Sequence, residues 1–359
     1  MASPDRVRLV VLFGGRSAEH EVSCTTAAHV LAAADPDRYE VEAVGITRDG
    51  TWVRSEDALA ALAAGRAALP SRVTAAGTAV EPLPAVTPAT GGLPVVVLPL
   101  LHGPFGEDGT VQGLLELAGV PYVGSGVLGS ALCMDKVKAK EVLRAHRVPQ
   151  GPYLALRDTE TDRAQEAVAA EGLAYPLFVK PANLGSSVGV TKAHEPGELD
   201  DAVALAASYD EWIVIEEGVE GREIEVAVLG NAEPRASVPG EIVTSHEFYD
   251  YDDKYIDGTC QLVVPAPLGD EATERVRALA LDAYRALRCD GMARVDFFYE
   301  EGRRGFLVNE VNTIPGFTPG SMFPMLWQAS GLSYPDLIDE LVRLAVERHD
   351  HRSRFSTKR

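Results

Sequence analysis

The chain has 359 residues, of which 46% are hydrophobic, and it carries a formal net charge of −20. This length suits two or three domains with sizeable cores, and the acidic balance argues against a general nucleic-acid-binding protein. The four cysteines are dispersed without a CxxC spacing, which gives no zinc motif and fits a reduced compartment. With no long apolar run and no signal-peptide pattern, we expect a cytoplasmic protein with no membrane partner.

The first part of the chain alternates strands and helices. Apolar runs typical of buried parallel strands occur at 7–15, 39–47 and 94–101. Helices are expected at about 17–34 and 56–68. Residues 69–92 are expected to form an irregular segment on the surface, because they are rich in Pro, Thr, Ala and Gly. The alternation predicts a small, doubly wound α/β domain at residues 1–124.

Two further regions are predicted, at residues 125–220 and 221–359. The first should hold one helix of about 17 residues at 130–146, strands at 151–156, 175–180, 188–192 and 211–219, and helices near 160–171 and 196–208. The second should hold a strand at 222–230, a polar aromatic loop at 245–259, a helix at 270–287, a hairpin and two C-terminal helices.

The hairpin, RVDFFYEEGRRGFLVNEVNT (294–313), places polar residues at alternate positions. Arg294 and Asp296 share one strand face, and Glu310 and Asn312 share one face of the partner strand. If these are the same face of the sheet, two carboxylates and an amide converge, which is the oxygen ligand set that Mg²⁺ accepts beside phosphate oxygens. A solvated antiparallel hairpin is the alternative.

The stretch YPLFVKPANLGSSVGV (175–190) is the strongest local signal for an anion site. A strand ends in Lys180, and a loop with Gly185, Ser186, Ser187 and Gly189 follows. Glycines let backbone N–H groups approach an anion closely, and the lysine adds a point charge for phosphate. The pattern differs from a P-loop, which needs GxxxxGK[ST] entering a helix. A plain glycine hairpin is the alternative.

Two other stretches offer nucleotide contacts. Lys136 lies near a helix start in MDKVKAK, where a solvated helix face is the simpler interpretation. The acidic residues of IEEGVEGRE (215–223) could hold ribose hydroxyls while the backbone holds adenine, although a surface turn would look the same.

Polar residues that could hold a smaller substrate are spread along the chain. Glu19 lies in the first turn of a helix, where acids also stabilise the helix dipole. His102 lies in a glycine-rich loop after a parallel strand, at the end of such sheets where ligands bind. Gly316 could offer its N–H to an oxyanion, and Ser321 could bind a carboxylate or only cap a helix.

The order of these motifs carries more information than any one of them. The chain contains in succession GGRSAEHEVS, LHGPFGEDGTVQG, GSALCMDKVKAK, FVKPANLGSSVGV, EFYDYDDKY, RVDFF and NEVNTIPGFTPGSM. Over about residues 7–345 this closely resembles the D-alanine–D-alanine ligase family of the ATP-grasp superfamily. The resemblance implies three α/β domains with ATP held between the second and third.

The resemblance also implies an activity. Members join two D-alanines through a D-alanyl phosphate at the expense of ATP, for peptidoglycan precursor synthesis. The implied ligands are D-alanine, ATP and two Mg²⁺ ions, for which Mn²⁺ can substitute. A homodimer that does not bind nucleic acid is the implied assembly.

Residue roles follow by match to the family's motifs. The metal ligands would be Asp296, Glu310 and Asn312. The phosphate-binding lysines would be Lys136, Lys180 and Lys254, and the other nucleotide contacts would be Glu216, Glu217, Val219 and Glu223. The substrate contacts would be Glu19 for the first D-alanine's ammonium, Ser321 for the second D-alanine's carboxylate, and His102 and Met322. Arg294 and the Gly316 N–H would stabilise the oxyanion, and Ser186 and Tyr255 would link the glycine lid to the 245–259 loop.

Three alternatives differ in substrate or in class. A D-alanine–D-lactate (depsipeptide) ligase would carry a different loop, because the EFYDYDDKY pattern looks like the dipeptide-forming type. Another ATP-grasp enzyme, such as a biotin-dependent carboxylase, would lack the SAEHEVS and PGFTPGSM stretches. A silent nucleotide-binding regulator would be expected to lack part of the metal set or Arg294.

Overall fold

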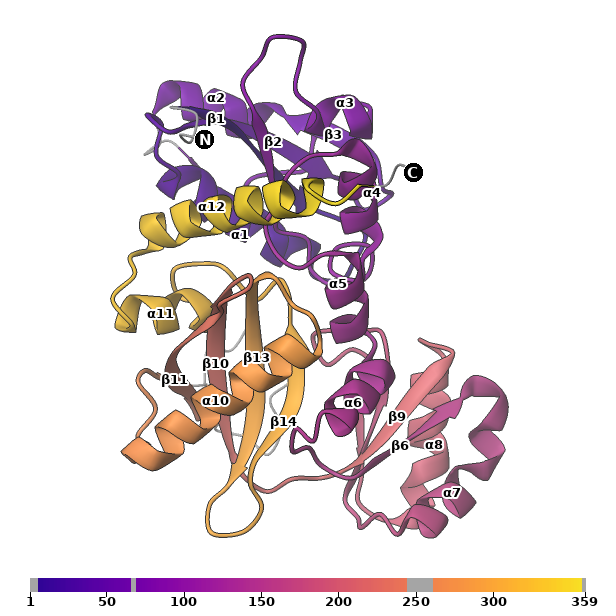
Figure 1. Cartoon of the computed structure of the whole chain (residues 1–359). Helices are drawn as coiled ribbons and strands as arrows, with labels where there is room; N and C mark the ends of the chain where they lie inside the picture. The colour runs from indigo at the N-terminus through magenta and orange to yellow at the C-terminus, as the bar shows by residue number, and fades with distance from the viewer. Residues whose placement is uncertain (1–5, 66–68, 244–260, 357–359) are drawn as a thin grey trace.

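The computed structural model describes residues 6–65, 69–243 and 261–356 and contains three β-sheets with helices packed against them (Figure 1). The mixed α/β class is as predicted. None of the helices in these ranges is both long enough and apolar enough to cross a bilayer.

The N-terminal sheet has the strand order β4-β3-β2-β1-β5. Its strands are β1 (Val7–Gly14), β2 (Tyr39–Ile46), β3 (Trp52–Ser55), β4 (Gly77–Ala79) and β5 (Val95–Pro99). β1 pairs in parallel with both β2 and β5, as predicted, whereas β3 and β4 form an antiparallel edge. The sequence pattern did not reveal this edge, because its strands are only four and three residues long. The helices of this part are α1 (His20–Ala33), α2 (Glu56–Ala64), α3 (Pro82–Val86) and α4 (Thr110–Ala118).

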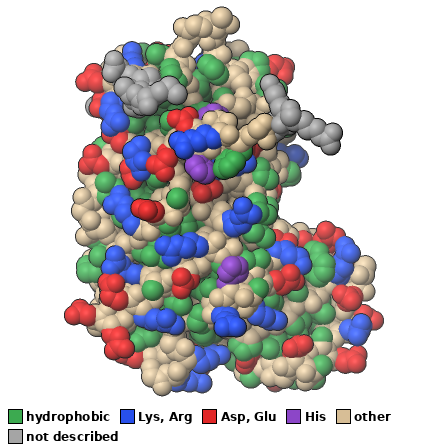
Figure 2. Space-filling model, viewed as in Figure 1, with side chains coloured by type: hydrophobic (Ala, Val, Ile, Leu, Met, Phe, Trp, Pro, Cys, Tyr) green, Lys and Arg blue, Asp and Glu red, His purple; other side chains and the backbone are tan. Residues whose placement is uncertain are grey.

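The central sheet is antiparallel, with the order β6-β9-β7-β8. Its strands are β6 (Tyr153–Arg157), β7 (Leu177–Pro181), β8 (Thr191–Ala193) and β9 (Trp212–Glu217). The 3-10 helix η2 (Asp158–Arg163), α7 (Ala164–Glu171) and α8 (Pro196–Ala207) accompany it, and α7 and α8 close a separate apolar core against the sheet. In Figure 2 this lobe is set off from the rest of the molecule by a hollow on one side.

The C-terminal sheet is also antiparallel, with the order β12-β11-β10-β13-β14. Its strands are β10 (Arg222–Gly230), β11 (Arg235–Val243), β12 (Gln261–Val263), β13 (Gly291–Glu300) and β14 (Gly305–Asn312). The long helix α10 (Asp270–Ala286) covers one face with a continuous apolar core. The predicted hairpin is therefore present, and the opposite face of β10, β13 and β14 is left for the site described below.

The single helix predicted over 130–146 is wrong. The structure has two helices, α5 (Val127–Met134) and α6 (Lys136–Ala145), separated at Asp135. Asp135 has an extended conformation (φ −80°, ψ 99°), and its side chain accepts a hydrogen bond from the Lys138 N–H, so it caps α6. The Lys136 N–H donates instead to the Ala182 carbonyl (3.1 Å), which ties the start of α6 to the end of β7.

The last two helices, α11 (Met322–Ala329) and α12 (Tyr334–Ser353), join the N-terminal and C-terminal sheets. One apolar core contains Leu9 and Phe13 of β1, Trp327 of α11, Leu341 of α12 and Met292 of β13. Figure 1 shows α12 running between the two sheets. Burial on this scale ties the two sheets to each other, because separating them would expose the shared core.

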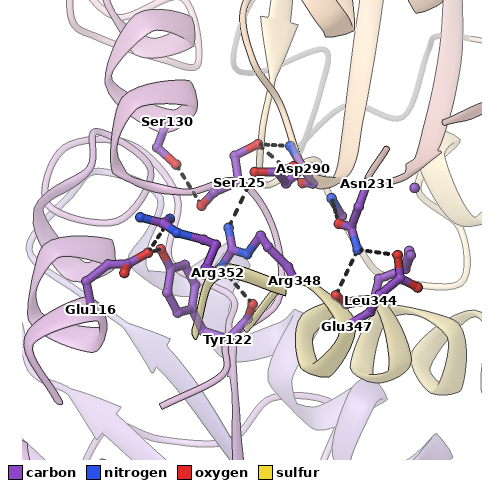
Figure 3. Close-up of polar contacts among 12 residues, drawn as sticks. Glu116, Tyr122, Ser125, Ser130, Asn231, Asp290, Leu344, Glu347, Arg348 and Arg352 are labelled. Carbon is purple, nitrogen blue, oxygen red and sulfur yellow. Dashed lines mark hydrogen bonds and ion pairs between the residues drawn. The ribbon is translucent and has the colours of Figure 1, made fainter. Parts of the chain in front are cut away.

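Polar contacts reinforce this junction at the far end of α12 (Figure 3). The buried Arg348 donates to the Tyr122 carbonyl (3.1 Å), lies over the Tyr122 ring (4.1 Å) and faces the Asp290 carboxylate (4.0 Å). Burial raises the pKa of Asp290, and the Arg348 charge opposes that shift. Arg352, one turn further on, makes an exposed ion pair with Glu116 (2.7 Å).

This geometry predicts unequal effects of two arginine substitutions. Arg348→Ala should lower the free energy of unfolding by about 1–3 kcal/mol, because it leaves the Tyr122 carbonyl without its donor and the half-buried Asp290 carboxylate without its nearest cation. Arg352→Ala should cost less than about 1 kcal/mol, since its partner is solvated. Urea unfolding followed by tryptophan fluorescence measures both, and equal losses would contradict the assignment of Arg348 to the junction.

Candidate active site

The polar face of the C-terminal sheet brings three carboxylates into one row. Glu225 of β10 lies opposite Asp296 of β13, and Asp296 lies opposite Glu310 of β14. Arg294 and Asn312 form the next opposed pair on the same two strands. The alternation of side chains in paired strands puts all five on one face. The convergence predicted for the hairpin is therefore present, and it extends to a third strand.

Arg294 forms ion pairs with two of these carboxylates. Its Nε and Nη2 donate to the two oxygens of Asp296 (2.7 Å each), and Nε also lies 2.9 Å from the Glu225 Oε2. Burial by itself lowers the pKa of Arg294, but the charges of Asp296 and Glu225 outweigh it and hold that pKa well above its usual value. The guanidinium is therefore a fixed positive charge in the centre of the row.

A cavity of about 430 Å³, here called the lysine cavity, lies between the central and C-terminal sheets. The sequence-predicted residues that line it are Lys136, Lys180, Ser186, Glu216, Glu217, Val219, Glu223, Arg294, Asp296 and Glu310. Lys136 comes from the start of α6, Lys180 from β7 and Glu216 from β9, so three separate elements supply its charges.

The charges of the lysine cavity are arranged around Glu216. Lys180 Nζ lies 3.0 Å from one Glu216 oxygen, and Lys140 Nζ lies 3.4 Å from the other. Burial raises the pKa of Glu216, but the Lys140 and Lys180 charges reverse this and leave it lowered. Burial also lowers the pKa of Lys136, which lies 3.9 Å from Glu310 and donates to the Leu184 carbonyl (2.7 Å). Two lysines thus contact the buried Glu216 and a third lies beside Glu310, and the charges of Lys136 and Lys180 in the cavity wall would attract an anionic ligand.

A second cavity of about 550 Å³, here called the Glu19 cavity, adjoins the first. The sequence-predicted residues that line it are Glu19, His102, Ser186, Arg294, Glu310, Asn312, Gly316, Ser321 and Met322. His102 is fixed by a contact between its Nδ1 and the Ile314 carbonyl (3.0 Å), while its buried Nε2 has no hydrogen-bond partner among the described residues. The two cavities share Ser186, Arg294 and Glu310, and so meet at the carboxylate row.

The glycine loop of the central sheet closes over this meeting point. Ser186 Oγ donates to Glu19 Oε1 (2.5 Å), which connects the loop to the start of α1. Ser186 and Ser187 both have left-handed backbone conformations (φ 50° and 58°), which are uncommon for residues other than glycine. The loop therefore holds a conformation that its contacts with neighbouring elements must stabilise.

The proposed metal ligands suit a hard cation. Asp296 and Glu310 face each other across β13 and β14, and the Asn312 amide nitrogen donates to Asp296 (2.9 Å). The described ranges hold no cluster of three or more His, Cys, Asp or Glu side chains arranged for a metal ion. Two carboxylates and an amide beside the lysine cavity nevertheless match the way Mg²⁺ is usually held, by one or two carboxylates plus phosphate oxygens and water.

Every sequence-predicted site residue within the described ranges lines one of the two cavities. Their individual roles stay predictions. Lys254 and Tyr255, the two remaining ones, lie outside the described residues.

Three further charged residues belong to this region and were not among the predicted site residues. Glu225 was findable, because it lies two residues after Glu223 on the same strand face. Glu107 lines the Glu19 cavity and accepts from the Gly103 N–H (2.8 Å). Lys140 is buried and lies 3.4 Å from Glu216, which lines the lysine cavity, and it could not be found by sequence reasoning, since a lysine on an amphipathic helix is ordinarily solvated.

Models of one protein family match most of the chain. The model described as "D-ala D-ala ligase N-terminus" matches residues 8–125, and the model described as "D-ala D-ala ligase C-terminus" matches residues 142–343. The chain belongs to the D-alanine–D-alanine ligase family. The family assignment made from the motif order is thereby confirmed.

Individual relatives agree along almost the whole chain. The D-alanine–D-alanine ligase of Thermoanaerobacter sp. (strain X514) is 48% identical, over 98% of this chain and 99% of the relative. That of Geobacillus kaustophilus is 46% identical, over 97% and 96%. Among solved structures, the D-alanine–D-alanine ligase from Coxiella burnetii superposes with a TM-score of 0.81 at 35% identity, over 98% and 97%. The VanG D-Ala:D-Ser ligase from Enterococcus faecalis gives 0.82 at 35% identity, over 95% and 99%. The fold of this family member is the predicted ATP-grasp architecture.

Glu107 gives a prediction for the pH dependence of stability. Burial and the nearby Glu19 raise its pKa from 4.5 to about 8, although the Gly103 and Ile314 N–H groups oppose the shift. The folded chain then binds a proton that the unfolded chain releases, so this group's contribution to stability falls as pH rises from about 5 to 8. Glu107→Gln should therefore gain stability relative to the unsubstituted protein across that window.

Urea unfolding at pH 5.5, 7 and 8.5 measures this difference. Glu301→Gln, in the exposed turn of the β13–β14 hairpin, is the control and should show no such trend. A constant difference between the Glu107 variant and the unsubstituted protein would contradict the raised pKa.

Proposed function

We propose that this protein uses ATP to join two D-alanine molecules into D-alanyl-D-alanine through a D-alanyl phosphate intermediate. The observation that carries the proposal is the meeting of the two cavities at Arg294 and Glu310. A lysine-rich cavity suits a triphosphate, and a cavity with Glu19, Ser321 and the Gly316 backbone suits an amino acid. Their shared wall is where the γ-phosphate and a carboxylate would react.

In the first step, a carboxylate oxygen of the first D-alanine attacks the γ-phosphorus, and ADP leaves. Two anions must meet, so the main barrier is electrostatic repulsion. Lys136 and Lys180 would hold the phosphates, with Lys254 as a further phosphate contact, while Glu216, Glu217, Val219 and Glu223 would hold the nucleoside. Glu19 would bind the substrate's ammonium and so orient its carboxylate toward the lysine cavity.

In the second step, the amine of the second D-alanine attacks the acyl phosphate carbon, and phosphate leaves. Arg294 and the Gly316 N–H would stabilise the oxyanion of the tetrahedral intermediate. Ser321 would receive the second substrate's carboxylate, with His102 and Met322 lining its surroundings. The loop containing Ser186, together with Tyr255, would exclude water that could hydrolyse the acyl phosphate.

Asp296, Glu310 and Asn312 would hold two Mg²⁺ ions, or Mn²⁺ in their place. Bound there, the ions would neutralise phosphate charge and orient the phosphates for in-line transfer. The chain's own contribution is to place two carboxylates side by side and to offset their charge with Arg294 and Lys136.

Related ligases differ in the second substrate that they join to D-alanine. The curated relatives at 43–48% identity are named D-alanine–D-alanine ligases, and their agreement favours D-alanine over D-lactate. The VanG structure is titled a D-Ala:D-Ser ligase, so D-serine is the substrate to compare first. A dipeptide for peptidoglycan precursor synthesis is the expected product.

Cellular location, assembly and domain boundaries are proposed here from membership of the family. We expect a cytoplasmic homodimer that binds no nucleic acid, and we place the domain boundaries at 1–124, 125–220 and 221–359. The match to the N-terminal family model ends at residue 125, which supports the first boundary.

The test is ATP-dependent phosphate release with Mg²⁺, supplying D-alanine, L-alanine, or D-alanine with D-serine or D-lactate, and mass analysis of the product. Release that depends on D-alanine and yields D-alanyl-D-alanine is expected. A mixed ester would move the assignment to a depsipeptide ligase. No release from folded protein with any of these substrates would refute ligation of D-alanine.

Glu310→Gln tests the metal set. It should reduce turnover by about 100-fold or more, because it removes a charge and a ligand while keeping the side chain's shape. Glu301→Gln removes the same charge from the exposed turn of that hairpin and should leave turnover unchanged. Near-normal phosphate release by a folded Glu310 variant would remove Glu310 from the metal site.

A further inference from the structure

Asp296 serves two partners that compete for its oxygens. In this structure both of its carboxylate oxygens accept hydrogen bonds from Arg294, and one also accepts from Asn312. The proposed function requires the same carboxylate to ligate a divalent cation and Arg294 to act on the reacting carbonyl. A bound cation would draw the Asp296 oxygens toward itself and repel the guanidinium, so Arg294 needs a second anchor.

Glu225 is placed to be that anchor. Its Oε2 lies 2.9 Å from Arg294 Nε, the same nitrogen that donates to Asp296 at 2.7 Å. The Nε–H donates its hydrogen bond to Asp296 and meets Glu225 as an ion pair, so a guanidinium that gives up its Asp296 contacts can turn this N–H to Glu225. Glu225 is 5% exposed and lies on the neighbouring strand in register with Asp296, so its carboxylate has little freedom to move away.

We propose that Glu225 is a positioning residue that holds the Arg294 guanidinium at the reaction centre when Asp296 turns to the divalent cation. This inference rests on the proposed function, and it assigns Glu225 no contact with substrate. Glu225 lines both cavities at their meeting point, and a guanidinium held there by one fixed carboxylate stays aimed at the site where oxyanion charge develops.

The charge balance supports the same conclusion. In the row Glu225–Asp296–Glu310, the ion pairs are made by Arg294 to the first two carboxylates and by Lys136 to the third. When a divalent cation takes up the charges of Asp296 and Glu310, Glu225 becomes the only carboxylate of the row left to offset Arg294. Without it, a buried guanidinium would face a divalent cation with no counter-charge from this row.

The experiment uses Glu225→Gln and Glu225→Asp in the full-length protein. Glu225→Gln keeps the side chain's size and removes its charge, and Glu225→Asp keeps the charge but withdraws it by about one methylene. Both should lower kcat by roughly 10- to 100-fold, since a displacement of the order of 1 Å costs that much. The KM values for ATP and D-alanine should stay within about twofold.

Cation affinity provides a readout that does not depend on turnover. Calorimetric titration of Mn²⁺ into the protein with saturating ADP should give a Kd several-fold weaker for Glu225→Gln, because Arg294 would then hold Asp296 alone. In an Arg294→Ala background the same substitution should change the Kd less, since the guanidinium that mediates the effect is gone.

Glu241→Gln is the matched control. Glu241 is buried and forms a bidentate pair with the half-buried Arg222 in the same sheet (2.7 and 2.8 Å), but neither residue lines either of the two cavities. Its loss should lower stability without changing kcat or the Mn²⁺ Kd. If Glu225→Gln does not fold, Glu225→Asp carries the test.

Three results would overturn the proposal. One is wild-type kcat and Mn²⁺ affinity in a folded Glu225 variant. Another is a raised D-alanine KM with unchanged kcat, which would make Glu225 a direct substrate contact. The last is an equal effect on the Mn²⁺ Kd with and without Arg294. If the unsubstituted protein itself fails to ligate D-alanine, the proposed function fails first and separately.

Discussion

The site depends on keeping three like charges side by side on a largely buried sheet face. Glu225, Asp296 and Glu310 lie in register on β10, β13 and β14, where their mutual repulsion would be large without counter-charges. Arg294 and Lys136 supply these, the first from the same sheet and the second from the break between α5 and α6. If the row holds the proposed metal ions, they would take over from these protein cations, a role that an apolar or fully neutral face could not offer.

The N-terminal part and the central sheet of the fold each bring further polar residues to that row. The core shared by β1, α11, α12 and β13 fixes the N-terminal sheet relative to the C-terminal one, so Glu19 and His102 reach the row from a rigid frame. The central sheet has an apolar core of its own, and α6 packs both against that sheet and against the C-terminal core. Lys180 and the glycine loop therefore reach the row from a separately packed part of the fold, whereas Glu19 and Arg294 come from parts that share one core.

The sequence predicted the features that depend on local periodicity. The hairpin 294–311 and its shared polar face followed from alternation alone, and the parallel strands followed from continuous apolar runs. The break at Asp135 was missed because helical periodicity continues across it. The structure explains the break by the Asp135 cap on α6 and by the bond from the Lys136 N–H to the Ala182 carbonyl. The strands β3 and β4 were missed because they are too short to show a period. Lys140 matters through Glu216, a partner distant in sequence that no local pattern specifies, whereas Glu225 could have been inferred from the strand face it shares with Glu223.

Glu19 is the side chain that contacts the glycine loop and also the one proposed to bind the first substrate's ammonium. Its Oε1 accepts the hydrogen bond from Ser186, and a Cβ at Gly103 or at Gly185 would come within 3.2 Å of its Oε2, a tight contact that glycine avoids. If the same carboxylate also binds the ammonium of the first D-alanine, loop closure and substrate binding share one group. Linkage then requires that each favour the other by the same factor, or oppose it by the same factor. A carboxylate has lone pairs enough for both partners. Closure that orders Glu19 in advance would therefore strengthen D-alanine binding, and bound D-alanine would hold the loop shut while the acyl phosphate exists.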